Sequence, residues 1–213
     1  MKLTEAILKK IINEVLEEGM KTLADLPEGV FIKIASFSDE DGMPVIDIFY
    51  ADEEGVEMDF GNSSMPYGEM RIDIKPHLAD EFPCLDAMMV AHSSTAIGWG
   101  PLLYDVAIEV ATIMAGGLVS DRSMVSSSAY KVWDFYQNRR TDVKKIQLDN
   151  PEGELTPDKK EDDCLQSIAD YYAEKTKIPW NKSPLSKLYR KEPTTLRDLQ
   201  DGGKLINDLN LNF

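Results

Sequence analysis

Cysteine, histidine and long apolar runs are scarce in this chain, and each shortage excludes a class of protein. The 213 residues include two cysteines and two histidines, and no apolar run reaches the roughly eighteen residues that a membrane-spanning helix needs. Cys84 and Cys164 have no spacing typical of a zinc site or a disulfide framework. The first residues also lack the uninterrupted apolar stretch of a secretory signal. We therefore expect a protein of a reducing compartment, the cytoplasm, with no membrane partner.

Positive charge is also in short supply. Lys and Arg together number 23 against 38 Asp and Glu, which gives a formal net charge of −15. Binding to the phosphate backbone of a nucleic acid needs a basic face, so we expect no nucleic-acid partner. The excess of acid either attracts a cationic partner or serves only to keep the surface solvated.

The beginning of the chain carries the clearest helical pattern. Residues 3–20 place apolar side chains on one stripe at helical spacing, and Thr4 is positioned to cap the helix. This amphipathic helix either packs on the core or docks a partner. The length and the 43% of hydrophobic residues suffice for one core. We therefore expect an N-terminal helix within residues 1–25 and one domain over residues 26–213.

From residue 29 the hydrophobic period changes from helical to alternating, which is typical of strands. Four such segments, separated by turns or loops, follow one another at 30–37, 44–50, 56–60 and 70–75. A short apolar run at 87–91 then has the character of a buried strand. This order predicts a meander of antiparallel strands that leads into a central strand.

The remainder of the chain mixes helices and strands. Strands are expected at 118–121, 143–148 and 185–191, and helices at 129–136, at 164–172 and beyond Thr194. The segment 150–184, between the last two strands, is long and begins strongly polar. The predicted fold class is α+β, with a mixed, mostly antiparallel sheet flanked by helices and an extra N-terminal amphipathic helix.

We expect a ligand at the junction between the central strand and the next helix. Gly98 and Gly100 precede a helix whose apolar positions recur from Leu102 to Met114, and Pro101 stands in its first turn, where proline is tolerated. The unpaired N–H groups and dipole of a helix start attract anions, and glycine lets a phosphate approach the backbone. The turn lacks the lysine of a Walker A loop and the third glycine of a dinucleotide fingerprint. Two glycines alone are also compatible with an ordinary connection.

Candidates for acid–base chemistry and for metal binding are few. His92 follows the central strand and can act as a base because imidazole titrates near neutral pH, although it can equally be an ordinary loop residue. Cys84 lies near His77 and His92 in the sequence but has no signature of a Cys–His nucleophile, so we expect a structural cysteine. The acidic turn at 39–41 lacks the spacing of a calcium loop, and we expect no metal site.

The residues around this junction resemble the acetyl-CoA-binding motif of the GNAT superfamily of N-acetyltransferases. In that family Gln/Arg-x-x-Gly-x-Gly/Ala follows a strand ending in a valine and precedes a long helix. Here Val90 is followed by residues 95–100 and by the pair Leu102 and Leu103. Thr95 stands where the family has Gln or Arg, which removes one side-chain contact to the pyrophosphate. Segments 98–111, 120–139 and 162–166 also resemble a divergent, phage-encoded branch of this superfamily.

The resemblance implies acetyl-CoA as the cofactor. Its pantetheine arm would pair with the backbone of the central strand, its pyrophosphate would sit at the helix start, and the helix over 129–136 would lie over its thiol. The implied cofactor-binding residues are Met89, Val90, Ala91, Ala96, Ile97, Gly98, Trp99, Gly100, Pro101, Leu102, Leu103 and Ser128.

A catalytic tyrosine is harder to place. The family often has a tyrosine on the later helix that gives its proton to the departing thiolate, but the matching position here is Trp133. Tyr136 or Tyr130 would have to serve instead, unless solvent protonates the thiolate, since thiols have a pKa near ~8.5. These aromatic side chains can otherwise be core packing.

Taken with the resemblance, the sequence predicts an acetyl-CoA-dependent N-acetyltransferase acting on a primary amine, such as a protein lysine, an N-terminus or a small amine. His92 is the candidate base, and segment 150–184 would shape the acceptor site, as the corresponding segment often does in the family. The alternative is a non-catalytic GNAT-like virion or interaction protein. It would dock to a capsid or another protein through its N-terminal helix, which resembles the leader helices of proteins from large marine phages.

Overall fold

The structure is a computed structural model that describes residues 19–39, 41–52, 65–74, 84–121, 124–149, 162–164 and 178–213. Its strands are β1 (Phe31–Ser38), β2 (Pro44–Ala51), β3 (Gly68–Asp73), β4 (Met88–Thr95), β5 (Leu118–Val119), β6 (Val143–Gln147), β7 (Lys187–Lys191) and β8 (Leu205–Asn207). The longer helices are α2 (Gly100–Met114), α3 (Ser127–Asn138) and α5 (Thr194–Asp201). The predicted strand at 56–60 lies outside the described residues, as do nearly all of the helices predicted at 3–20 and 164–172.

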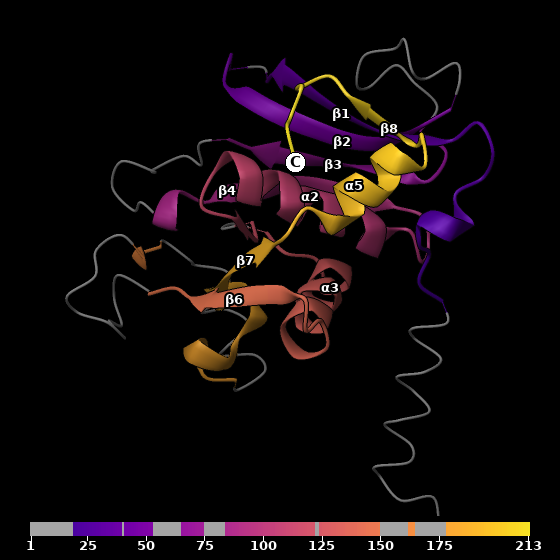
Figure 1. Cartoon of the computed structure of the whole chain (residues 1–213). Helices are drawn as coiled ribbons and strands as arrows, with labels where there is room; N and C mark the ends of the chain where they lie inside the picture. The colour runs from indigo at the N-terminus through magenta and orange to yellow at the C-terminus, as the bar shows by residue number, and fades with distance from the viewer. Residues whose placement is uncertain are drawn as a thin grey trace, which may run out of the picture.

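Within the described residues one eight-stranded sheet has the order β6-β7-β5-β4-β3-β2-β1-β8 (Figure 1). Strands β1 to β4 form the predicted antiparallel meander. The pairs β4–β5 and β1–β8 are parallel, so the sheet is mixed and mostly antiparallel. The α+β class is therefore confirmed. No helix among the described residues is both long enough and apolar enough to cross a membrane.

Helix α2 is the centre of the core. Pro101 stands in its first turn, as predicted, and Gly116 and Gly117 follow its end. Val106, Ala107 and Val110 of this helix are all buried. They lie on one face because residues three and four apart are neighbours on a helix surface. These side chains pack against the apolar residues of β2, β3 and β4 in a single cluster.

A buried ion pair joins α2 to the C-terminal part of the chain. The Glu109 carboxylate pairs with the Lys191 ammonium, and their side chains are 0% and 3% exposed. Glu109 also accepts hydrogen bonds from the N–H groups of Thr195 and Leu196, at 2.8 and 2.7 Å. These are N–H groups of the first turn of α5, which have no intrahelical partner. A side chain of α2 thus caps α5.

The expectation that the two cysteines are not paired is wrong. Cys84 and Cys164 form a disulfide with their Cα atoms 4.9 Å apart. Residues 162–164 return beside the start of β4, where the Cys84 N–H donates to the Asp163 carbonyl at 3.1 Å. A separation of 80 residues carries no local signal, so only the fold reveals this pairing. The cysteine content therefore no longer favours a reducing compartment.

Candidate functional site

A cleft opens where β4 and β5 separate. The two strands are paired in parallel through Met88–Leu118 and Met89–Val119, after which β5 ends and β4 continues to Thr95. Among the described residues, no strand pairs with the β5-facing edge of β4 from Val90 onward. The cleft has a volume of about 440 Å³ and is lined by Val90, Ala91, His92, Ser93, Tyr104, Asp121, Met124, Val125, Ser126, Ala129 and Trp133. An open strand edge beside a cleft is a place where an extended ligand can bind backbone N–H and C=O groups.

A β-bulge in β4 lies at this point. Arg71 of β3 is opposite His92 and Ile72 is opposite Val90, so Ala91 is an extra residue without a partner in β3. A bulge interrupts the ladder, bends the strand and increases its twist, and bulges are common next to active sites. The bend accounts for the separation of β4 from β5 along Val90–Thr95.

His92 lines the cleft. Its side chain is 56% exposed, and its Nε2 lies 3.6 Å from Glu69 Oε1 of β3. Next to it, Arg71 makes two hydrogen bonds to the fully buried Asp47, at 2.8 and 3.0 Å. Burial raises the pKa of Asp47 although its bonds with Arg71 oppose that rise. His92 therefore lies beside a carboxylate that can orient its ring, at the edge of a charged patch on β2 and β3.

Two hydroxyl groups meet on another side of the cleft. Tyr104 Oη and Ser93 Oγ lie 3.3 Å apart and are hydrogen-bonded. Burial raises the pKa of Tyr104, so its hydroxyl keeps its proton and acts as a hydrogen-bonding group. Neither residue was among those predicted from the sequence. Tyr104 reads as one more residue of an amphipathic helix, and Ser93 as part of a turn after the strand.

The predicted tyrosines lie elsewhere. The Tyr136 hydroxyl donates to the Pro101 carbonyl and to Asp105, each at 2.8 Å, and burial and the Asp105 charge raise its pKa well above the ordinary value. Neither Tyr136 nor Tyr130 is among the residues lining the cleft. Trp133, by contrast, does line it and is 1% exposed.

The glycine turn is covered by the beginning of the described chain. A Cβ on Gly98 would lie 2.3 Å from the Gly19 carbonyl oxygen, and the Lys21 N–H donates to the Gly98 carbonyl at 2.9 Å. Gly98 also has a positive φ of 86°, which favours glycine. A Cβ on Gly100 would lie 3.1 Å from Thr95 Oγ1. Close contacts with protein atoms thus account for both glycines without any ligand.

The predicted cofactor-binding residues fall into separate environments. Val90 and Ala91 line the cleft, and Met89 precedes them in the paired part of β4. Ile97 is 99% exposed and Ala96 is also exposed. Three others are buried in the core: Trp99, Leu102 and Leu103. Ser128 is exposed and outside the cleft lining, whereas Ser126 lines the cleft and caps α3 by accepting from the Ala129 N–H.

A second hollow borders the start of α2. It has a volume of about 420 Å³ and is lined by Met20, Pro101, Lys131, Val132, Asp134, Phe135 and Arg139. The cationic Lys131 and Arg139 come from α3, and Pro101 marks the positive end of the α2 dipole. The hollow therefore combines apolar walls with two cationic side chains, which favour an anion, and one carboxylate, Asp134, which opposes it.

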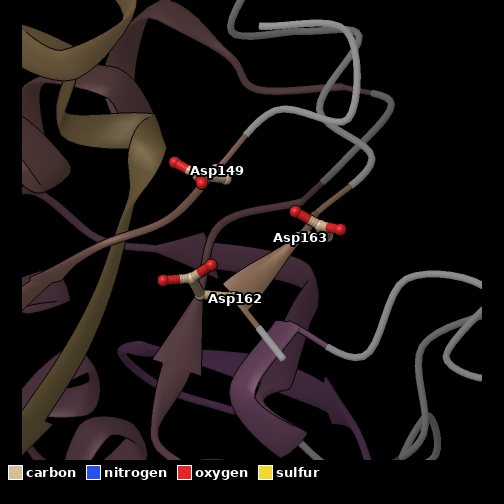
Figure 2. Close-up of side chains that lie close together, drawn as sticks. All are labelled: Asp149, Asp162 and Asp163. Carbon is tan, nitrogen blue, oxygen red and sulfur yellow. The ribbon is translucent and has the colours of Figure 1, made fainter. Parts of the chain in front are cut away.

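Three aspartates gather near the disulfide (Figure 2). One carboxylate oxygen from each of Asp149, Asp162 and Asp163 lies within 4.8 Å of the others. The backbone holds them together, since the Asp149 N–H donates to the Asp162 carbonyl and the Cys164 N–H donates to the Asp149 carbonyl, each at 2.9 Å. The cluster thus forms where segment 162–164 meets the end of β6.

Comparisons with known proteins gave no match, so a function has to be inferred from the cleft. No family model, no curated protein and no solved structure matches the chain.

Proposed function

We propose that the protein is an acetyl-CoA-dependent N-acetyltransferase of GNAT-like fold. The observation that carries the proposal is the cleft beside the open edge of β4. The parallel pairing of β4 with β5 ends after two residues. Residues 90–93 of β4 then line a space of about 440 Å³. The two amides of a pantetheine arm are suited to such an edge, because they can bond to it as an added strand does.

Acetyl-CoA would supply an activated thioester, and the residues of the chain would position it. The backbone around the bulge at Ala91 would hold the arm and offer an N–H group to the thioester oxygen. The hydroxyls of Ser93, on β4, and Tyr104, on α2, would hydrogen-bond to the arm. The Lys131 and Arg139 hollow and the nearby Lys21 side chain provide positive charge for the phosphates, although the segment 19–21 rests on the glycine turn itself.

The acceptor would be a primary amine. His92 would remove its proton as the new C–N bond forms, with Glu69 orienting the imidazole and stabilising its charge. Asp121 in the cleft lining and Glu69 beside His92, within a chain of net charge −15, favour a cationic acceptor before it loses that proton. The departing thiolate would take a proton from solvent, which its pKa near ~8.5 permits.

A thermal-shift titration with acetyl-CoA and CoA tests the proposal. For a Kd of about 10 µM, 1 mM ligand stabilises by about 2.7 kcal/mol, a rise in Tm of roughly 5–10 °C for a chain of this size. Ala129→Phe should abolish the shift by filling the cleft, whereas Ser127→Phe, on the exposed side of the same helix start, should keep it. The absence of a shift with either ligand in the wild type contradicts the proposal.

Replacing His92 with glutamine should lower kcat for acetyl transfer by about 10²–10⁴-fold, the usual contribution of a general base. The KM for acetyl-CoA should change little, since His92 contacts the amine. Thiol release in the presence of spermidine or of a lysine peptide measures the rate. Glu69→Gln should give a smaller loss in kcat. Equal rates for His92→Gln and the wild type would remove His92 from the mechanism.

One observation favours the second candidate, a non-catalytic GNAT-like interaction protein. The Gly19 carbonyl lies against Gly98 and the Lys21 N–H bonds to it, at the place where the resemblance would put the pyrophosphate. This protein would dock through its N-terminal helix, which is almost wholly outside the described residues. Binding of neither CoA nor acetyl-CoA, together with capture of a capsid protein that is lost when residues 1–18 are deleted, would support it.

A further inference from the structure

Tyr104 and Trp133, which line the cleft, pack with Tyr189 to form an aromatic wall. The Trp133 ring is perpendicular to the Tyr104 ring, with centroids 5.2 Å apart, and lies 5.0 Å from the Tyr189 ring at 31°. The three residues are 1%, 2% and 0% exposed. Close packing on both sides leaves a side chain of this size little freedom to move aside.

The strand register places this wall at the narrow end. Tyr189 of β7 is opposite Leu118 of β5, and Leu118 is opposite Met88 of β4. Trp133 packs on Tyr189, so it stands near the level at which β4 and β5 are still paired. From there the two strands separate toward Thr95. A linear ligand that binds along β4 would therefore meet Trp133 with its tip.

Hydrogen bonds fix the wall and keep it apolar. The Tyr189 hydroxyl donates to the Pro184 carbonyl at 2.7 Å, and the Tyr104 hydroxyl bonds to Ser93. Both hydroxyls are thus engaged by protein groups, and the Tyr189 hydroxyl also donates to the Trp133 carbonyl at 3.4 Å. Trp133 lines the cleft together with Val90 and Ala129, and an apolar lining of this kind suits a short apolar group.

We propose that Trp133 determines the length of the acyl group, admitting a two-carbon chain and excluding longer ones. The inference rests on the proposed function, since it concerns the donor of that reaction. A rigid apolar pocket discriminates by about 10–200-fold for one methylene. Trp133 stands where the resembled family has a proton-donating tyrosine. In this protein it would instead select the acyl-CoA donor by the length of its acyl group.

The test compares the Kd values of acetyl-, butyryl- and hexanoyl-CoA, obtained from thermal shifts. In the wild type, affinity should fall by at least about tenfold from acetyl- to hexanoyl-CoA. In the Trp133→Leu variant, hexanoyl-CoA should bind at least as tightly as acetyl-CoA. Trp133→Phe, a milder change that retains an aromatic ring, should lie between the two and serves if the leucine variant does not fold.

Tyr130→Leu is the matched control, because Tyr130 is an aromatic residue of the same helix that lines neither the cleft nor the hollow at the start of α2. It should keep the wild-type preference for the short chain. Equal affinities for all three thioesters in the wild type, or an unchanged preference in both Trp133 variants, would overturn the inference while leaving the proposed function intact. If CoA itself does not stabilise the wild type, the proposed function fails and the inference fails with it.

Discussion

Replacing Lys191 with methionine is expected to lower the free energy of unfolding by about 3–5 kcal/mol. The Glu109 side chain is fully buried and loses its counter-charge in this variant. Its remaining bonds to the N–H groups of Thr195 and Leu196 offset part of that loss. Glu109→Leu should cost at least as much, because it leaves the buried ammonium with only the Asp142 carboxylate at 4.0 Å and the hydroxyls of Thr194 and Thr195, and it also removes the cap of α5.

Urea unfolding of both single variants and of the double variant measures this pair. The double variant should be more stable than the sum of the two losses predicts, since two apolar groups can replace a buried ion pair with little penalty. Lys21→Met, which breaks the more exposed Lys21–Asp25 pair, is the control and should cost at most about 1 kcal/mol. A loss for Lys191→Met no larger than that of the control would show that the buried pair contributes little.

Removing the disulfide should lower the free energy of unfolding by about 4–5 kcal/mol, the chain-entropy value for a loop of this length. The bond joins residues 80 apart, so the reduced unfolded chain gains much conformational freedom. Urea unfolding with and without a phosphine reductant measures the effect. The Cys84→Ser/Cys164→Ser variant should match the reduced protein.

The same double variant is also the control, because the reductant should leave its stability unchanged. A thiol titration in denaturant should find no free thiol in the untreated wild type. Two free thiols per chain, with stability insensitive to the reductant, would contradict the pairing of Cys84 with Cys164.

The elements predicted from the sequence are those whose signal is local. Strands β1 and β2 and helix α2 each carry their own apolar period, and their boundaries agree with the prediction to within about two residues. Strand β4 was expected to end at Ala91, but it runs to Thr95. The strand was predicted from the apolar run alone, and the polar or small residues at 92–95 were expected to form a turn. They instead continue the pairing with β3 beyond the bulge. Strand β8 has only Leu205–Asn207 and is held by its pairing with β1, which no local pattern reveals.

The candidate site was predicted in part for the same reason. Val90, Ala91 and His92 are consecutive residues of one strand, so a sequence pattern can group them, and all three line the cleft. Tyr104 and Asp121 reach the cleft through packing across the fold. The contact between Lys21 and Gly98 joins residues far apart in the chain, and no sequence motif marks it. The walls of the site and the contact that covers its glycine turn therefore depend on tertiary structure and could not be predicted from the sequence.

The position of β7 between β5 and β6 has a consequence for biosynthesis. Strand β5 leaves the ribosome well before Lys187–Lys191, the residues that will lie along its other edge. Until then, β5 has only its two-residue pairing with β4, and Trp133 has no Tyr189 to pack on. The nascent chain therefore cannot pack Trp133 on Tyr189, or pair the second edge of β5, until β7 has emerged. Such dependence on distant segments is typical of domains that fold slowly.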